Sequence, residues 1–431
     1  MSLTVLIAPS GFKECLDPFD VAEAMAEGVA RAWPDARILK APVADGGEGF
    51  TRALTSATNG TLYPVDVTGP LGRKISAHVG ILGGTDRKTA ILEISAACGL
   101  SRVPRDQRNP ALTTSYGVGE LILKALDLGA EHILVGCGDS GVNDGGAGMI
   151  QALGGRLTNA NHHDIGFGGA ELNSLSAIVL SGLDQRLRHV TIDVTVNWHN
   201  DLLGTRGVTR VYGPQKGARP DQIDLLEAGL TNYASQILAT TGIDVGAANG
   251  TGASGGLGAA FLGLLGAKLH PRYDIIMQYL RFDELLAQAD LVLTAEGALD
   301  EQTPYGKVPA EVGRRARERG IPVFALAGSI GPGAKSNHEQ GIAAYSSIIA
   351  TPCSLADAMS SAEHLLADAA EQVLRTVAAG MSLAQSNRNR MRSGPLKHIA
   401  NQTQKNNALK RKGSKRSMIS AEHSRSTNTM L

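Results

Sequence analysis

Short apolar runs and amphipathic patterns alternate near the start of the chain. Residues 3–8 (Leu-Thr-Val-Leu-Ile-Ala) form a continuous apolar run, which is typical of a strand buried on both faces of a parallel sheet. Asp17 and Pro18 then indicate the start of a helix, and a second strand follows near residues 37–42. This β–α–β order predicts a parallel sheet with right-handed crossovers.

The next part of the chain has a different pattern. Strands are predicted in direct succession at residues 63–67, 75–80 and 89–94, with Gly69-Pro-Leu-Gly72 as a turn. Because no helices separate these strands, they predict a second, partly antiparallel lobe. Further elements are predicted as a helix at 113–129, a strand at 132–136, a helix at 145–153, a helix at 285–289, a strand at 291–294, a helix at 309–319, a strand at 322–327 and a helix at 355–379.

The pattern as a whole predicts an α/β fold with two domains. A Rossmann-like parallel-sheet domain is formed by both chain ends, residues 1–65 and 285–383, and a second α/β domain, residues 66–284, is inserted between them. The length of 431 residues supports more than one core. From residue 384 to 431 the apolar pattern stops, which predicts a disordered basic tail.

Charge is distributed unevenly. Residues 384–431 hold eleven of the 41 Lys and Arg but one of the 41 Asp and Glu, so the tail carries a formal +10 and residues 1–383 carry −10. The mildly acidic body gives no reason to expect a nucleic-acid partner for the main fold. Residues 410–416 (Lys-Arg-Lys-Gly-Ser-Lys-Arg) are either a solvated extension or a nuclear-localisation or nucleic-acid patch.

The compartment is predicted from the cysteines and the apolar runs. Cys15, Cys98, Cys137 and Cys353 lack metal-ligand spacing, so we expect free buried thiols in a reducing compartment. The opening run is too short for a signal peptide, and the longest apolar runs fall below the roughly 18 residues that span a bilayer. We therefore expect a cytoplasmic protein without a membrane partner.

Glycine-bearing loops follow several predicted strands, where open α/β sheets bind ligands. The first loop, residues 8–13, ends in Lys13, which is either a solvated lysine or the partner of a phosphate or carboxylate. The second, residues 43–49 (Val-Ala-Asp-Gly-Gly-Glu-Gly), presents Asp45 and Glu48. Asp45 is either part of a plain turn, a Mg²⁺ ligand or the acceptor of a substrate hydroxyl proton.

Three further loops combine glycines with polar side chains. The loop at 136–148 presents Ser140, Asn143 and Asp144 before a helix, whose N-terminal amides suit an anion. The loop at 213–218 presents Lys216. The loop at 250–258 contains Gly255 and Gly256 and leads into an apolar helix, an arrangement that can cradle phosphates.

A sixth segment follows the strand predicted at 291–294. It contains Glu296 and Asp300, with Lys307 shortly after. Carboxylates for a metal and lysines for phosphate are what phosphoryl transfer requires. The sequence lacks the Walker pattern GxxxxGK[ST], a GxGxxG after the first strand and a GxSxG elbow, which disfavours P-loop, nicotinamide-dependent oxidoreductase and serine-nucleophile alternatives.

The ordered loops together resemble the type 1 glycerate kinase family over about residues 3–381. The matching stretches are PVADGGEG (42–49), VTGPLG (67–72), TTSYGVGELI (113–122), NDGGAGMIQALGG (143–155), GPQKGA (213–218), ASGGLGAA (253–260), Glu296-Gly297 with Asp300, and GKVP (306–309). The resemblance implies two α/β domains, one inserted in the other. It also implies phosphorylation of D-glycerate by ATP with Mg²⁺, usually giving 2-phosphoglycerate, and a homo-oligomer is possible.

The resemblance also suggests site residues, position by position. It implies catalytic roles for Asp45, Asp300 and Lys307, and metal binding by Glu296 and Asp300. The expected cofactor-binding residues are Lys13, Ser140, Asn143, Asp144, Lys216, Gly255 and Gly256. Glu48 is a further expected functional residue.

Several site loops depart from the family pattern. Ser10 and Gly11 replace Asp and Ser, Asp139 lies within the third loop, Asn197 replaces an Asp, and Ala298 replaces an Arg. Loss of a carboxylate at Asn197 and of a guanidinium at Ala298 removes a possible metal ligand or base and a possible carboxylate clamp. The sequence therefore leaves two alternatives to unchanged D-glycerate kinase activity. One is an altered preference among short hydroxy acids, and the other is a weakened or silent protein that binds small molecules.

Overall fold

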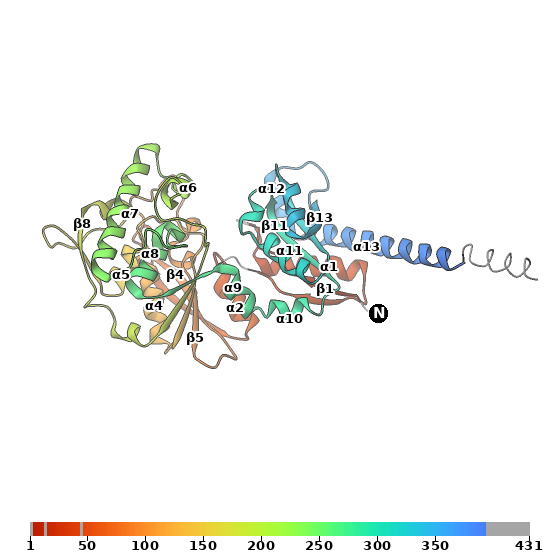
Figure 1. Ribbon diagram of the computed structural model, residues 1–431, viewed down its shortest axis with the longest axis horizontal. Helices are drawn as coiled ribbons and strands as arrows, with labels where there is room; N and C mark the ends of the chain where they lie inside the picture. The colour runs from red at the N-terminus through yellow and green to blue at the C-terminus, as the bar shows by residue number, and fades with distance from the viewer. Residues whose placement is uncertain (1–2, 13–14, 44–45, 394–431) are drawn as a thin grey trace, which may run out of the picture. The chain divides into compact units, whose positions relative to one another are not determined.

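The structure is a computed structural model that describes residues 3–12, 15–43 and 46–393, with side chains described up to Asn389 (Figure 1). The chain divides into a large compact unit, Met1–Glu371, and a second unit, Gln372–Leu431. Both sheets that carry candidate site residues lie in the first unit. No helix among the described residues is long and apolar enough to cross a membrane.

The first sheet of the described chain is built from both ends of the sequence and is parallel throughout (Figure 1). Its strand order is β13-β12-β11-β1-β2. The strands are β1 (Thr4–Ile7), β2 (Arg37–Lys40), β11 (Leu291–Leu299), β12 (Val323–Ile330) and β13 (Ile342–Ser347). Every residue of β1 is buried, which explains its uninterrupted apolar run.

The second sheet lies between these strands in the sequence and is mixed. In the described chain its order is β10-β9-β6-β5-β4-β3. The strands are β3 (Thr61–Thr68), β4 (Lys74–Ile81), β5 (Thr89–Glu93), β6 (His132–Gly136), β9 (Thr191–Val196) and β10 (Lys268–Pro271), with a separate hairpin of β7 (Arg156–Asn159) and β8 (Leu175–Val179). β3, β4 and β5 pair antiparallel, whereas β5, β6, β9 and β10 pair parallel, so the predicted partly antiparallel lobe is confirmed.

Helices connect and cover the strands. They are α1 (Pro18–Ala32), α2 (Phe50–Ala57), α3 (Ser95–Cys98), α4 (Tyr116–Asp127), α5 (Ala147–Ala152), α6 (Val208–Tyr212), α7 (Pro220–Thr241), α8 (Ala253–Leu265), α9 (Arg272–Tyr279), α10 (Phe282–Leu286), α11 (Val308–Glu318), α12 (Leu355–Ser360) and α13 (Ala362–Ser393). The predicted start of α1 is confirmed, because the Asp17 carboxylate accepts hydrogen bonds from the amides of Phe19 and Asp20 over 2.8 and 3.0 Å.

Two large apolar clusters lie in the described part of the large unit. One lies within the second sheet and its helices, and includes Val135, Ile150 and Phe261. The other joins the first sheet to α2, α9 and α10, and includes Leu6 and Phe50. Because α2, Ile91 of β5 and Leu134 of β6 all contribute to this second cluster, α2 packs against the second sheet as well as the first.

The predicted fold class, α/β with two domains, is confirmed, while the exact domain boundaries stay a prediction. The predicted bounds of one strand and one helix were wrong. β11 continues to Leu299 because it pairs with β12 along its length, so Glu296 lies within a strand and not in a loop after it. The helix expected at 355–379 is divided into α12 and α13.

The predicted start of the disordered tail was also wrong, because α13 continues to Ser393. The first part of α13 buries Leu366, Ala370 and Leu374, and residues 384–393 continue the same helix. The remaining residues of the predicted tail, 394–431, lie outside the described residues. The cysteines are free as expected, although Cys353 is exposed and Cys15 is half-buried.

Candidate active site

A buried ammonium group lies among the loops that follow β6 and α6. Lys216 ends a 3₁₀ turn, Pro214–Lys216, and is only 3% exposed. Its Nζ donates to Ser140 Oγ over 2.9 Å and to the Val142 carbonyl over 2.8 Å. Burial lowers the Lys216 pKa to about 8, partly offset by Cys98, Cys137 and Asp144. The amine is therefore held by neutral oxygens, which leaves it able to attract an anion.

Asp144 anchors the loop that contains Ser140. Its carboxylate accepts from Ser115 N and Oγ, each over 2.8 Å, and from the amides of Gly146 and Gly148 over 3.2 and 3.3 Å. Burial raises the Asp144 pKa, while these hydrogen bonds oppose the rise. The Asp144 carboxylate is thus hydrogen-bonded to Ser115 and to two backbone amides, and these bonds fix the start of α5.

Asn143 is fully buried beside this anchor. Its Nδ2 donates to Thr209 Oγ1 over 3.0 Å. Its Oδ1 is buried and has no hydrogen-bond partner within the described part of the chain. A buried carbonyl oxygen that lacks a donor is costly, so this atom is a candidate ligand contact.

The glycine-rich first turn of α8 lies directly against the same loop. Ser254, Gly255 and Gly256 have φ values of 56°, 75° and 92°, so the chain makes a left-handed turn there. The Gly145 amide donates to the Gly255 carbonyl over 3.0 Å, and a Cβ on Gly255 would lie 2.0 Å from the Val142 oxygen. Only glycine allows this approach of two backbones.

These contacts bring six predicted cofactor-binding residues into one group, which we call the lysine loop cluster. It consists of Ser140, Asn143, Asp144, Lys216, Gly255 and Gly256. The buried Lys216 ammonium beside the left-handed glycine backbone is the kind of arrangement that can bind an anion.

The segment before α2 lies on the ends of β6 and β9. A Cβ on Gly136 would lie 2.6 Å from the Gly46 oxygen, and one on Gly138 would lie 2.8 Å from the Gly47 nitrogen. The Glu48 amide donates to Asp139 Oδ2 over 3.2 Å. The second and third predicted loops therefore meet. Two predicted site residues, Lys13 and Asp45, lie outside the described residues.

The remaining predicted residues form a second group, the carboxylate–lysine group, at the end of β11 and the start of α11. Lys307 Nζ lies 3.6 Å from Glu296 Oε1, 3.2 Å from Asp300 Oδ1 and 3.3 Å from the Ala298 carbonyl. Burial raises the Asp300 pKa, but the Gln302 amide and Lys307 outweigh it, so the pKa is below its usual value. Asp300 is therefore a carboxylate at neutral pH.

Three positions that depart from the family pattern make hydrogen bonds within the protein. Ser10 Oγ donates to the Ala295 carbonyl over 3.0 Å, and Asn197 Oδ1 accepts from the His199 amide over 3.3 Å. Ala298 offers its carbonyl to Lys307. Among the described residues there is no cluster of three or more His, Cys, Asp or Glu that could hold a metal.

Three residues near the site were missed by the sequence analysis: Ser115, Thr209 and Glu93. Ser115 lies within the quoted TTSYGVGELI motif, but nothing local shows that it reaches Asp144. Glu93 is the last residue of the apolar strand β5. An acidic residue at the carboxyl end of a buried strand is a pattern from which a site residue could have been predicted.

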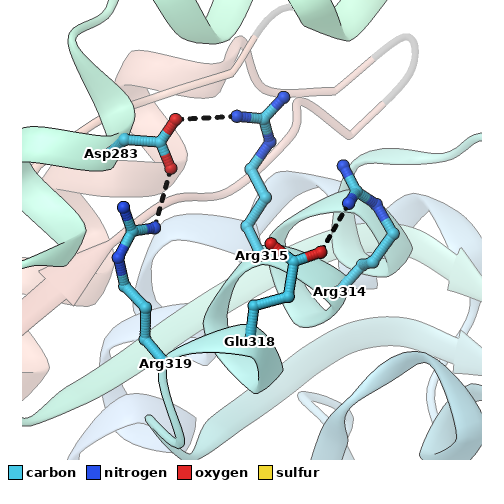
Figure 2. Close-up of a pocket in the computed structure, with 5 residues that line it drawn as sticks. All are labelled: Asp283, Arg314, Arg315, Glu318 and Arg319. Atoms are coloured by element: carbon cyan, nitrogen blue, oxygen red, sulfur yellow. Dashed lines mark hydrogen bonds and ion pairs between the residues drawn. The ribbon is translucent and has the colours of Figure 1, made fainter.

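A surface depression elsewhere contains Asp283, Arg314, Arg315, Glu318 and Arg319 (Figure 2). Asp283 pairs with Arg315 over 2.9 Å and with Arg319 over 2.8 Å. Arg314 pairs with Glu318 over 2.8 Å. Since each of these guanidinium groups already faces a carboxylate, this is an ion-pair network on α10 and α11 and not a phosphate site.

Comparison with known proteins gives one consistent result. Residues 5–378 match the model of the glycerate kinase family. The chain is 43% identical over 384 residues to "Glycerate kinase" of Bacillus subtilis strain 168, covering 89% of this chain and 99% of that protein. It is 43% identical over 379 residues to "Glycerate 2-kinase" of Escherichia coli K12, covering 88% and 99%.

A solved structure agrees with these relatives. The crystal structure of a candidate glycerate kinase 2 from Salmonella typhimurium LT2 superposes with a TM-score of 0.74 and 44% identity, covering 89% of this chain and 100% of that one. The matches extend through every loop that carries a described candidate residue. The chain therefore belongs to the glycerate kinase family and is a kinase.

Proposed function

We propose that this protein transfers the γ-phosphoryl group of ATP to D-glycerate and forms 2-phosphoglycerate. The observation that carries the proposal is the buried Lys216 ammonium, bonded to Ser140 Oγ and a carbonyl, within a shell of glycine backbone. The names of two relatives, "Glycerate kinase" and "Glycerate 2-kinase", support the substrate and the phosphorylated position.

The lysine loop cluster fits the phosphates of ATP. The Lys216 amine supplies positive charge where Coulombic attraction is little screened. Left-handed Gly255 and Gly256 keep side chains away from the backbone there. The unpartnered Asn143 Oδ1 is a hydrogen-bond acceptor, so it suits a donor such as a ribose hydroxyl or a metal-bound water. When bound, ATP supplies the phosphoryl group.

The carboxylate–lysine group fits Mg²⁺ by the chemistry of its donors. Glu296 and Asp300 offer hard carboxylate oxygens, and Mg²⁺ is usually held by one or two carboxylates together with phosphates and water. Lys307 lies close to both acids and would help to neutralise charge on the transferred group. The low pKa of Asp300 favours a role as a charged ligand over a role as a base.

The proton of the substrate hydroxyl needs an acceptor. We assign that role to Asp45, since Asp300 is engaged by Lys307 and Gln302. The hydroxyl oxygen would form a bond to the γ-phosphorus as the bond from that phosphorus to the β–γ bridging oxygen breaks. ADP then leaves with that electron pair, and the proton goes to Asp45.

A second candidate is a silent or weakened family member that binds a small molecule. Asn197 and Ala298 favour it, because they lack the charges expected at those positions. We further propose two domains, at residues 1–65 with 285–383 and at 66–284, a cytoplasmic location and a homo-oligomeric state. We propose no nucleic-acid partner for the main fold.

The test is an ADP-release assay with D-glycerate, L-glycerate and other C3–C4 hydroxy acids, followed by phosphorus NMR of the product. Release of ADP with D-glycerate and a phosphate signal coupled to the C2 proton would support the proposal. A signal coupled to the C3 protons would correct the position. Nucleotide binding without ADP release on any acid would favour the silent alternative.

A further inference from the structure

A buried carboxylate lies at the end of β5, outside the residues assigned so far. Glu93 is 3% exposed and is the register partner of Gly136 in β6. Its Oε1 accepts from the Gly49 amide over 3.2 Å and its Oε2 accepts from the Thr51 amide over 2.8 Å. The carboxylate therefore spans from the second sheet to the start of α2.

The start of α2 depends on this contact. Gly49 is the N-cap residue, has φ 87° and provides no side-chain hydrogen bond. The first amides of a helix need acceptors from outside the helix, and an acidic group is the favoured one there. In this chain the acceptor comes from a residue 42 positions away from Thr51 in the sequence.

The segment that Glu93 holds is in contact with the site loops on its other side. The Glu48 amide donates to Asp139 Oδ2 over 3.2 Å, and a Cβ on Gly46 would lie 3.0 Å from Thr195 Oγ1. The carboxylates of Glu93, at the end of β5, and of Asp139, in the loop after β6, thus accept hydrogen bonds from three amides of the segment. This geometry fixes residues 46–51, which directly follow the motif that contains Asp45.

Burial has a clear electrostatic effect on Glu93. It raises the Glu93 pKa to about 7, although the amides of Thr51 and Gly49 lower it, and Glu48 adds to the rise. Burying a carboxylate at this position therefore costs free energy that an apolar residue would not cost.

We propose that Glu93 is a positioning residue that sets the geometry of residues 46–51 for the phosphoryl-transfer site. It does not touch substrate and acts through the backbone amides that it binds. Its effect on turnover rests on the proposed kinase function, whereas its hold on the segment can be tested without any activity.

The test compares Glu93→Gln and Glu93→Asp with Glu120→Gln in the full-length chain. Glu120 is a matched control because its carboxylate, like that of Glu93, accepts a hydrogen bond from a backbone amide, here that of Thr68. It lies on α4 and pairs in addition with Lys74. Kinetics with D-glycerate and ATP, melting temperature and amide hydrogen exchange are measured for each variant.

We expect Glu93→Gln to lower kcat by about 10- to 100-fold with less than a threefold change in either KM, and to speed exchange at Gly49 and Thr51. Glu93→Asp should restore part of kcat, because it keeps the charge, and Glu120→Gln should leave kcat unchanged. If Glu93→Gln does not fold, Glu93→Asp is the deciding variant. A lowered kcat with faster exchange at Gly49 and Thr51 would support the proposal, and wild-type values of both would overturn it.

Two results would overturn the proposal. One is a wild-type kcat in Glu93→Gln. The other is that Glu93→Gln and Glu120→Gln both lose kcat in proportion to their loss of folded protein. If the unmodified chain releases no ADP with any acid, the kinase function itself fails. In that case, unchanged exchange at Gly49 and Thr51 in Glu93→Gln separately overturns the positioning role.

Discussion

Lys216 Nζ donates to Ser140 Oγ over 2.9 Å although the two residues are 76 positions apart in the sequence. Both side chains are buried, and neither partner of the amine is charged. A buried ammonium group with neutral acceptors is costly unless it serves to bind an anion. This relationship therefore links the loop at 136–148 to the loop at 213–218 at a candidate phosphate site.

Removing the Lys216 charge should cost activity more than stability. We expect Lys216→Met to lower kcat/KM for ATP by about 100-fold or more, because the charge that attracts phosphate is lost from a poorly screened position. Steady-state kinetics measure the effect. Lys268→Met, which changes an exposed lysine at the start of β10, is the control and should keep normal kinetics. Normal ATP kinetics in Lys216→Met would remove Lys216 from the site.

The stability of the protein should carry the signature of Lys216 titration. The folded-state pKa of about 8 lies below the ordinary value of 10.5, so the unfolded chain binds more protons between those values. The free energy of unfolding should therefore rise with pH from about 8 to about 10.5, and this rise should be absent in Lys216→Met. Urea unfolding at several pH values measures it. A rise of equal size in both proteins would contradict the assignment.

Asp300 and Lys307 should be required for turnover and dispensable for folding. Asp300 is partly exposed, with 26% of its side chain accessible, so Asp300→Asn removes charge at little structural cost. We expect kcat to fall about 100-fold and the Mg²⁺ concentration for half-maximal activity to rise. Lys307→Met should lower kcat without the change in Mg²⁺ dependence.

The control for this pair is Asp283→Asn, which breaks a carboxylate–arginine pair in the surface network of Figure 2. It should leave kcat and the Mg²⁺ dependence unchanged. If Asp300→Asn behaves like this control, Asp300 is outside the site.

Gly255 should tolerate no side chain. Alanine there must adopt φ 75° and would bring its Cβ to 2.0 Å from the Val142 oxygen. Gly266→Ala separates the two effects, since Gly266 has φ 64° with nothing within 4 Å of a Cβ. We expect about 1–2 kcal/mol of destabilisation at Gly266, from the left-handed conformation alone. Gly255→Ala should lose more in urea unfolding and also lose ATP binding. Equal losses in the two variants would show that the close backbone approach is unimportant.

The sequence by itself determined the fold class and the chemistry of the loops. Apolar runs such as residues 3–8 and helical spacing after Asp17 are local properties, and the elements they predict are present in the structure. The loops with Ser140, Lys216 and Gly255 were also identified, because glycine beside polar residues is visible along the chain, although the loops at 213–218 and 250–258 follow α6 and α7 and not strands.

Only the tertiary structure decided which of these loops meet. Contact between Lys216 and Ser140 depends on sheet order, which local patterning does not specify, and the low pKa of Lys216 depends on burial by distant segments. The role of Glu93 was missed for the same reason. Its partners Gly49 and Thr51 lie at the start of α2, and strands β3 and β4 separate α2 from β5 along the sequence. The extension of β11 through Glu296 likewise followed from its pairing with β12, a long-range contact that the residues of β11 alone do not reveal.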